Sequence, residues 1–265
     1  MKARARHVVF RQVYDMAAVV EASLADRDSL MELSWDEPEV RLGIAKPRQI
    51  SLLHQYIFAV IAIHHRYEYR KHADMHEAED ITELEALLDA YEIQYGRFKH
   101  FDPPIDEASA TTRAELPFYQ WFVSQESSFE MLWERMTDET FHLLFVNRSF
   151  LLSFNRSLAD YLSANRSLVP AEFRTADGKV ARQPLPQWAR DAVFFRDQGR
   201  CVLCHVDLSG LLSTDRVDHF DHMVPLAQWG TNDPCNLQLL CEACNVRKAA
   251  GEAVTGHRYA AWWRY

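Results

Sequence analysis

Four of the five cysteines in this 265-residue chain form two pairs with the same internal spacing. The pairs are Cys201-Val-Leu-Cys204 and Cys241-Glu-Ala-Cys244. In a reducing compartment, two Cys-x-x-Cys pairs are typical of a tetrahedral zinc site made of thiolates, not of a disulfide framework. We therefore expect these four sulfurs to hold a structural zinc ion. The fifth cysteine, Cys235, is interpreted as a small filler of the interior.

A second group of polar residues lies between and just after the cysteine pairs. Asp221 and His222 are adjacent at the end of a strand-like stretch. In such a pair, the carboxylate can hold a hard cation while the imidazole takes a proton from water, which are two tasks of phosphodiester hydrolysis. Asn236 opens a second strand-like stretch, and Asn245 follows Cys244 on a predicted helix, where its amide oxygen is a candidate second ligand. Two protein ligands leave room for water and phosphate, as is usual for magnesium.

These residues and the cysteine pairs together resemble the HNH endonucleases of the zinc-stapled type. The resemblance is carried, in order, by RDQGRCVLC, DHMVP, NLQLLC and CNVRK, and it covers less than a third of the chain. It implies a ββα-metal finger in which His222 is the general base and Asn236 keeps His222 oriented. It further implies that Asp221 and Asn245 bind the catalytic divalent ion, and that four cysteines hold zinc: Cys201, Cys204, Cys241 and Cys244.

The resemblance also implies a reaction. Water deprotonated by the histidine attacks phosphorus in line, and the products carry 5'-phosphate and 3'-hydroxyl ends. Many family members have histidine at the third signature position, where this chain has Asn245. An amide oxygen is a weaker ligand than imidazole for the softer transition metals, so the asparagine favours magnesium or manganese.

Neighbouring residues leave a choice of register and of substrate contacts. A second pair, Asp218-His219, precedes the first, but only Asp221-His222 has a proline three residues later. We therefore prefer Asp221-His222 and treat His219 as a neighbour of the substrate or of the metal.

The two cations after Asn245 are also candidates for substrate binding. Arg247 and Lys248 lie on the same predicted helix and are candidates for contacts with nucleic-acid phosphates. The alternative is a solvated helix end without a ligand.

The net charge of −9 is distributed unevenly along the chain. Residues 1–169 carry 18 Lys and Arg against 27 Asp and Glu, whereas residues 170–265 carry 11 of each. The C-terminal part can therefore present a local basic face to DNA, which we expect to be double-stranded. The basic N-terminus lacks the apolar segment of a secretory signal, and no apolar run is long enough to span a membrane. A cytoplasmic protein is expected.

Periodicity divides the chain into a helical part and a finger. Apolar residues recur at helical spacing up to residue 169, so a helical domain is predicted for 1–169, a proline-containing linker for 170–187 and the HNH domain for 188–265. The predicted fold class is thus mainly α with a small α+β part. Helices are expected at Gln12–Leu33, Ile50–Lys71, Ile81–Gln94, Pro117–Met136 and Asp138–Ala164; loops are expected at Pro38–Pro47 and Phe101–Thr112.

The function of the helical domain stays open at this level. Specificity, docking of a protein partner, self-association and inhibition are all compatible with it, and small HNH proteins of this layout resemble restriction or anti-phage defence effectors. The stretch RYEYRKHADMH has an arginine-to-histidine spacing similar to the ribonuclease motif of the HEPN family, at Arg66 with His72 or Arg70 with His76. The alternatives to a DNA-cutting enzyme are therefore an RNA-cutting enzyme and a non-catalytic zinc finger that binds nucleic acid or regulates.

Overall fold

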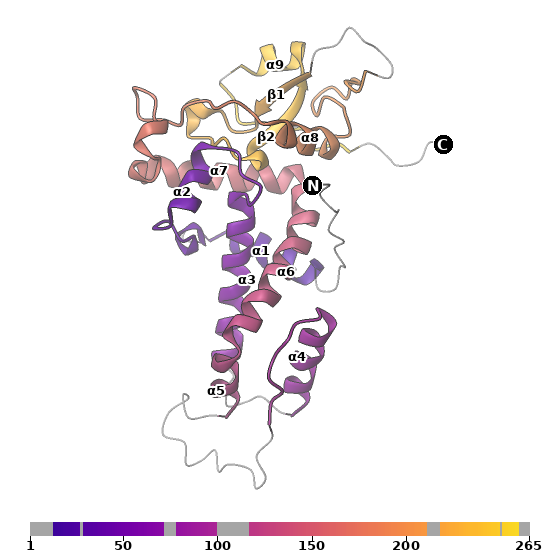
Figure 1. Ribbon diagram of the computed structural model, residues 1–265. Coiled ribbons are helices and arrows are strands. Elements are labelled where there is room, and N and C mark those ends of the chain that lie inside the picture. Colours follow the sequence, from indigo (N-terminus) through magenta and orange to yellow (C-terminus); the bar gives the residue numbers. More distant parts are fainter. Residues whose placement is uncertain are drawn as a thin grey trace, which may run out of the picture. The chain divides into compact units, whose positions relative to one another are not determined.

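The computed structural model describes residues 13–26, 29–71, 78–99, 117–210, 218–249 and 251–259. These residues are mainly helical and include one two-stranded antiparallel sheet near the C-terminal end (Figure 1). The predicted class, mainly α with a small α+β part, is confirmed. None of the described helices is long and apolar enough to cross a membrane.

Internal contacts group the described residues into two compact units. The first unit draws on Met1–Val19 and Ile57–Thr140, and the second on Val20–Tyr56 and Phe141–Tyr265. The second unit therefore groups part of the predicted helical domain with the cysteine-rich segment. The predicted domain boundaries at residues 169 and 187 stay a prediction.

The α-helices and strands have the following bounds: α1 Val13–Ser23, α2 Pro38–Ala45, α3 Leu52–Lys71, α4 Ala78–Ala90, α5 Pro117–Ser124, α6 Glu126–Phe145, α7 Arg148–Ala164, α8 Gln187–Arg196, β1 Asp218–His222, β2 Leu237–Cys241 and α9 Glu242–Lys248.

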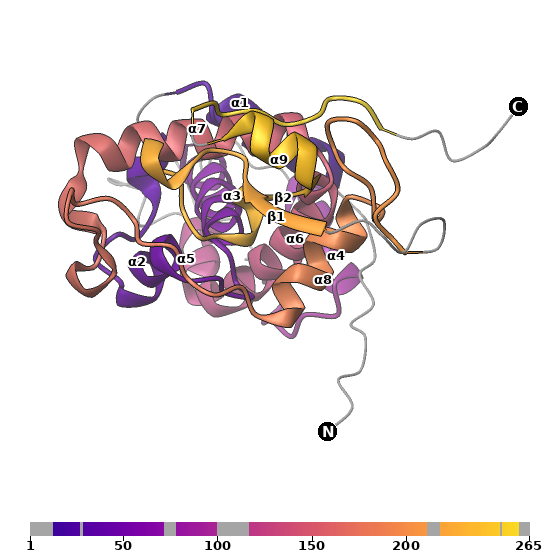
Figure 2. The same cartoon turned by 90° about the horizontal axis from the view of Figure 1, so that it is seen from above.

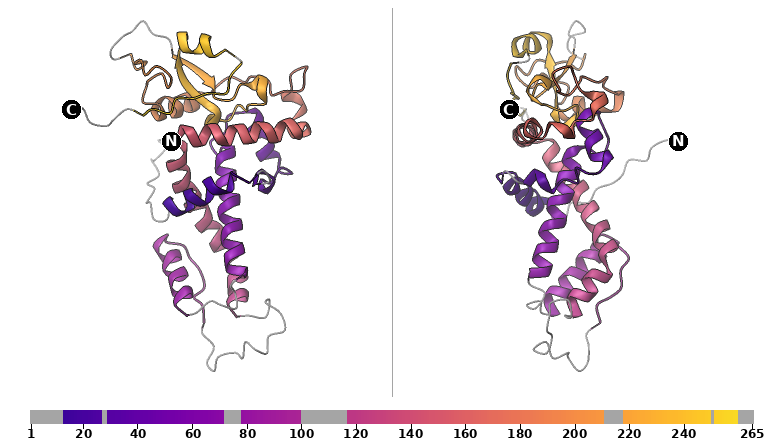
Figure 3. Two further views of the ribbon diagram at one scale, coloured as in Figure 1. Left: turned by 180° about the vertical axis from the view of Figure 1, so that it is seen from behind. Right: turned by 90° about the vertical axis from the view of Figure 1, so that its left-hand side faces the viewer.

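Aromatic side chains fill the core of the first unit. Phe129 and Trp133 of α6 are fully buried, and their rings lie 6.3 Å apart. Within this unit α3 runs beside α6 (Figure 3), and the Arg66 guanidinium lies 4.8 Å from the centre of the Trp133 ring. Large apolar rings buried at helical spacing explain why this part of the sequence forms packed helices.

In the second unit, α8 and α9 pack against the antiparallel pair of β1 and β2. In Figure 2, α9 lies along the two strands. A small apolar core joins α8 to β2 through Val193, Leu237 and Leu239, which are all fully buried. The finger-like order of strand, strand and helix predicted from the sequence is therefore present.

The start of α3 contributes to the second unit through its cap. Ser51 and His54 form a reciprocal cap, in which the Ser51 N–H donates to His54 Nδ1 at 3.1 Å and the His54 N–H donates to Ser51 Oγ at 3.3 Å. The Leu52 N–H donates to Asp233 Oδ2 at 2.7 Å. Because free N–H groups at a helix start need acceptors, Asp233 fixes the loop before β2 to the beginning of α3.

Some expected elements differ from those observed. The loop predicted at Pro38–Pro47 is wrong, because Pro38 occupies the first turn of α2, where a proline costs no hydrogen bond. The helices predicted at Pro117–Met136 and Asp138–Ala164 are divided differently: one break falls at Gln125, and another at Val146 and Asn147, where the Asn147 side chain caps α7.

The segment predicted as a linker contains a short hairpin that turns at Asp177-Gly178, with a bridge between Arg174 and Val180. The predicted loop at Phe101–Thr112 lies outside the described residues, as do His72 and His76 of the stretch similar to the HEPN motif.

Candidate functional site

The four paired cysteines come together in the folded chain. All four Sγ atoms lie within 4.8 Å of one another, and those of Cys204 and Cys241 are 3.6 Å apart. Zinc–sulfur bonds of about 2.3 Å in a tetrahedron separate the sulfurs by roughly 3.8 Å. The spacing and the donor set therefore fit a structural zinc ion, as predicted.

The backbone explains how each pair presents its sulfurs. Cys201 and Cys204 lie on a tight turn closed by the His205 N–H donating to the Cys201 carbonyl at 2.8 Å, and His205 itself has a positive φ of 60°. Cys241 ends β2, and Cys244 lies in the first turn of α9. Arg247 Nη2 donates to Cys244 Sγ at 3.1 Å, which places a cation beside a sulfur that becomes a thiolate on metal binding.

Asp221 lies on the face of the hairpin that α9 covers. Its Oδ2 pairs with Lys248 Nζ at 2.9 Å and accepts a bond from Gln238 Nε2 at 3.3 Å. Lys248 Nζ also donates to the carbonyl oxygen of His222 at 2.8 Å, so the lysine ties α9 to β1. Among the described residues, nothing bonds Asp221 Oδ1, and this oxygen remains available to a cation.

Asn245 is placed by the same helix. It precedes Lys248 by three residues on α9, and residues three apart lie on one face of a helix. Since Lys248 reaches Asp221, this face of α9 is turned toward β1. The half-buried side-chain amide of Asn245 makes no hydrogen bond to the described residues, so it too has an unused oxygen.

The His222 side chain lies on the opposite face of β1 from that of Asp221. The register pairs His222 with Leu237 and Asp221 with Gln238, and successive side chains of a strand alternate. The His222 ring is 2% exposed, and its Nε2 lies 3.2 Å from Asn232 Oδ1. Burial, followed by the positive charge of Arg182, lowers the pKa of His222 to about 4.

Asn232 determines which ring nitrogen of His222 carries the proton. Its Nδ2 donates to the carbonyl oxygens of Ala45 at 2.8 Å and Ala181 at 2.9 Å, which leaves its Oδ1 to face the histidine. An oxygen accepts only from a protonated nitrogen, so we infer that Nε2 carries the hydrogen and Nδ1 keeps the lone pair. The low pKa keeps this ring neutral near pH 7.

Asn236 closes the loop that joins the two strands. Its Oδ1 accepts from the Val224 N–H at 2.9 Å, and its Nδ2 donates to the carbonyls of Val224 at 3.0 Å and Thr231 at 2.9 Å. The side chain is fully buried. This geometry is what a loop-fixing asparagine next to His222 requires.

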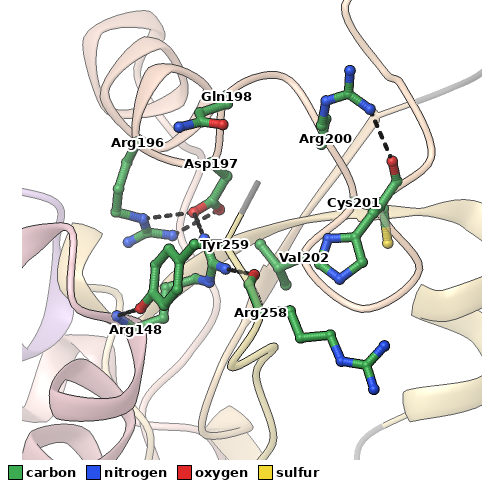
Figure 4. Close-up of a pocket in the computed structure, with 10 residues that line it drawn as sticks. Arg148, Arg196, Asp197, Gln198, Arg200, Cys201, Val202, Arg258 and Tyr259 are labelled. Carbon is green, nitrogen blue, oxygen red and sulfur yellow. Dashed lines mark hydrogen bonds and ion pairs between the residues drawn. The ribbon is translucent and has the colours of Figure 1, made fainter. Parts of the chain in front are cut away.

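A buried network of charged residues connects β2 with neighbouring elements of the second unit. Asp197, after α8, accepts bonds at 2.9 Å from Nε and Nη2 of Arg196 (Figure 4). It also accepts one at 2.9 Å from the Leu239 N–H. Arg148 of α7 lies 3.7 Å from the same carboxylate and is stacked on the ring of Tyr259. One carboxylate thus joins α7, α8 and β2 of the second unit, and Arg148 adds the C-terminal segment through Tyr259.

The structure therefore assembles most of the predicted residues, with specific differences in partners. The four cysteines meet, and Asp221 and Asn245 lie on the sides of β1 and α9 that face each other, whereas the His222 side chain lies on the opposite face of the hairpin. Lys248 is 7% exposed and bonded to Asp221, while Arg247 is exposed apart from its bond to Cys244. The predicted contacts of these two cations with phosphate, like the catalytic assignments, stay predictions.

Two residues of the site were not predicted from the sequence. Asn232 lies in the stretch Gly-Thr-Asn-Asp-Pro, where an asparagine is typical of an ordinary turn. Gln238 lies within an apolar strand, and only the register shows that it faces Asp221. A single sequence offers no signal that separates either residue from its common structural uses.

Comparison with known families identifies this segment. Residues 201–251 match the family model described as HNH endonuclease. The chain therefore contains an HNH endonuclease domain, which includes the four cysteines, β1, β2 and α9. No curated protein and no solved structure gave a match to the chain.

Proposed function

We propose that this protein is a metal-dependent endonuclease that hydrolyses phosphodiester bonds of double-stranded DNA. The observation that carries the proposal is the coincidence of the HNH match with unused ligand atoms on Asp221 and Asn245. The family match supports a nuclease acting on nucleic acid; the choice of DNA is part of the proposal. A zinc ion held by the four cysteines would be structural, because four thiolates leave no open position.

His222 acts as the general base in this proposal. Its neutral ring accepts a proton from water at Nδ1, since Nε2 is engaged by Asn232. The pKa of about 4 keeps the base form populated at neutral pH. Asn232 holds the ring in the required tautomer, and Asn236 holds the loop through three bonds to the backbone.

Asp221 and Asn245 would hold a catalytic Mg²⁺ or Mn²⁺ ion. Such an ion, when bound, neutralises charge that develops on phosphate oxygens. Lys248 compensates one oxygen of Asp221 and anchors α9 against β1, which keeps the face of α9 that carries Asn245 turned toward β1. Gln238 fixes the same carboxylate from the neighbouring strand.

Nicking of supercoiled plasmid tests the proposal. Zinc-loaded protein is incubated with plasmid and Mg²⁺ or Mn²⁺, beside an EDTA control, His222→Ala and the matched control His257→Ala, which changes an exposed histidine. We expect nicked or linear DNA from the wild type and from His257→Ala only. Cleavage that survives in His222→Ala would contradict the assignment of the base, and cleavage of RNA alone would favour the RNA-cutting alternative.

The remaining assignments concern the context of the enzyme. A cytoplasmic location is supported by thiol ligands that need a reducing compartment. We assign the acidic N-terminal part to a protein partner or to self-association within a restriction or defence system, because an acidic surface is poorly suited to DNA. Size-exclusion chromatography with light scattering tests self-association directly.

A further inference from the structure

We propose that His219 is a third protein ligand of the catalytic divalent ion, and that its imidazole shifts the preference of the site from Mg²⁺ towards Mn²⁺ and other transition-metal ions. This inference rests on the function proposed above and extends its cation site.

Strand geometry places His219 beside Asp221. The two residues are separated by one position on β1, and side chains two apart lie on the same face of a strand. The register confirms the face, because His219 pairs with Leu240 and Asp221 with Gln238, whose side chain does contact Asp221. The face is the one turned to α9, as the Lys248–Asp221 ion pair shows.

Within the described part of the chain, two buried polar atoms on this face have no hydrogen-bond partner. His219 Nε2 and Gln238 Oε1 are both shielded from solvent and bond to none of the described residues. More than nine in ten buried polar groups in proteins are hydrogen-bonded, so each orphan calls for an ion or a water molecule. The register places these two residues diagonally on one face, with Asp221 adjacent to each of them.

The unused atoms form a mixed ligand set. His219 Nε2 joins Asp221 Oδ1, which no described residue bonds, because Lys248 and Gln238 both contact Oδ2. Asn245 supplies an amide oxygen from the facing helix. A set of one nitrogen and two oxygens is more favourable for Mn²⁺ than for Mg²⁺, because imidazole binds transition-metal ions better than hard alkaline-earth ions.

Metal binding, measured without DNA, tests this assignment. Zinc-loaded full-length protein is titrated with Mn²⁺ and followed by electron paramagnetic resonance, with Mg²⁺ as competitor. We expect His219→Ala to weaken Mn²⁺ binding by about tenfold or more. Even the loss of a residue that only hydrogen-bonds a metal ligand lowers metal affinity by about 10- to 100-fold. The control His257→Ala should bind like the wild type.

The spectrum gives a readout that a merely structural histidine would not move. A coordinated imidazole modulates the Mn²⁺ spin echo through its ¹⁴N nucleus, and we expect this modulation in the wild type and in His222→Ala but not in His219→Ala. His219→Asp tests the preference between Mn²⁺ and Mg²⁺ while keeping a ligand at this position. Replacing the nitrogen ligand by an oxygen ligand should raise the affinity for Mg²⁺ relative to that for Mn²⁺.

The outcomes separate this inference from the proposed function. If Mn²⁺ binding is lost in Asp221→Ala but unchanged in His219→Ala, His219 is not a ligand while the cation site stands. Modulation that disappears in His222→Ala instead would also overturn the assignment. If the wild type binds no Mn²⁺ and cuts no plasmid, both proposals fail.

Discussion

Removing the charge of Asp197 provides a sharp test of the energetics of the second unit. The Asp197 side chain is fully buried, and it neutralises Arg196, which is 1% exposed, and Arg148, which is 7% exposed. Asp197→Asn keeps the shape but leaves these two cations without their carboxylate. It also turns an amide NH₂ toward donors of Arg196 or toward the N–H of Leu239.

The expected cost follows from that geometry. Breaking a buried ion pair by removing one partner costs about 3–5 kcal/mol, mostly because the remaining charge stays buried. We therefore expect the free energy of unfolding to fall by about 4 kcal/mol. With a denaturant slope of about 2 kcal/mol per molar urea, the midpoint should fall by about 2 M.

The assay must report on the second unit, because a chain of two compact units can unfold in more than one step. Zinc release into a chromophoric chelator during urea titration reports on the cysteine cluster in that unit. Asp191→Asn is the matched control, since Asp191 is an exposed residue of α8, the helix that precedes Asp197, and should change stability by less than about 0.5 kcal/mol. A midpoint for Asp197→Asn within experimental error of the control would refute the reasoning.

Three further predictions concern protonation, close packing and metal removal. Burial lowers the pKa of His54 to about 4. The stability that depends on its neutral form is therefore complete above pH 6.5 and falls by about 3 kcal/mol as the pH drops towards 4. Urea titrations at several pH values should show a flatter dependence of stability on pH for His54→Asn, and an unchanged dependence would contradict this. Gly230→Ala should destabilise the loop by about 3 kcal/mol or more, because the added Cβ would clash with the Val224 carbonyl, whereas the Cβ of Gly251→Ala meets open space. Thermal unfolding compares the two variants, and equal melting temperatures would count against the packing argument. Cys204→Ser should lower the zinc content measured by atomic absorption and abolish the cooperative unfolding of the HNH segment. A variant that keeps its full zinc content would contradict this prediction.

The chemistry of the finger was accessible from the sequence because it depends on donor types and local spacing. Two Cys-x-x-Cys pairs predict a zinc cluster whatever the rest of the chain does, and the structure brings their sulfurs together. The two strands and the helix that carry Asp221, Gln238 and Asn245 agree closely with the prediction, since apolar runs and turn residues define them locally. The error at Pro38–Ala45 has a similar local origin: proline was interpreted as a breaker where it begins a helix.

By itself, then, the sequence determined the four cysteines of the zinc cluster, the order of the two strands and the helix near the C-terminus, and the mainly helical class. Only the tertiary structure decided which atoms remain free. It pairs Lys248 with Asp221 and orients Asn232 toward His222 through the carbonyls of Ala45 and Ala181. It also gives His219 Nε2 no partner among the described residues. These contacts depend on strand register and on packing between segments far apart in the chain, and neither is encoded in the spacing of any one motif.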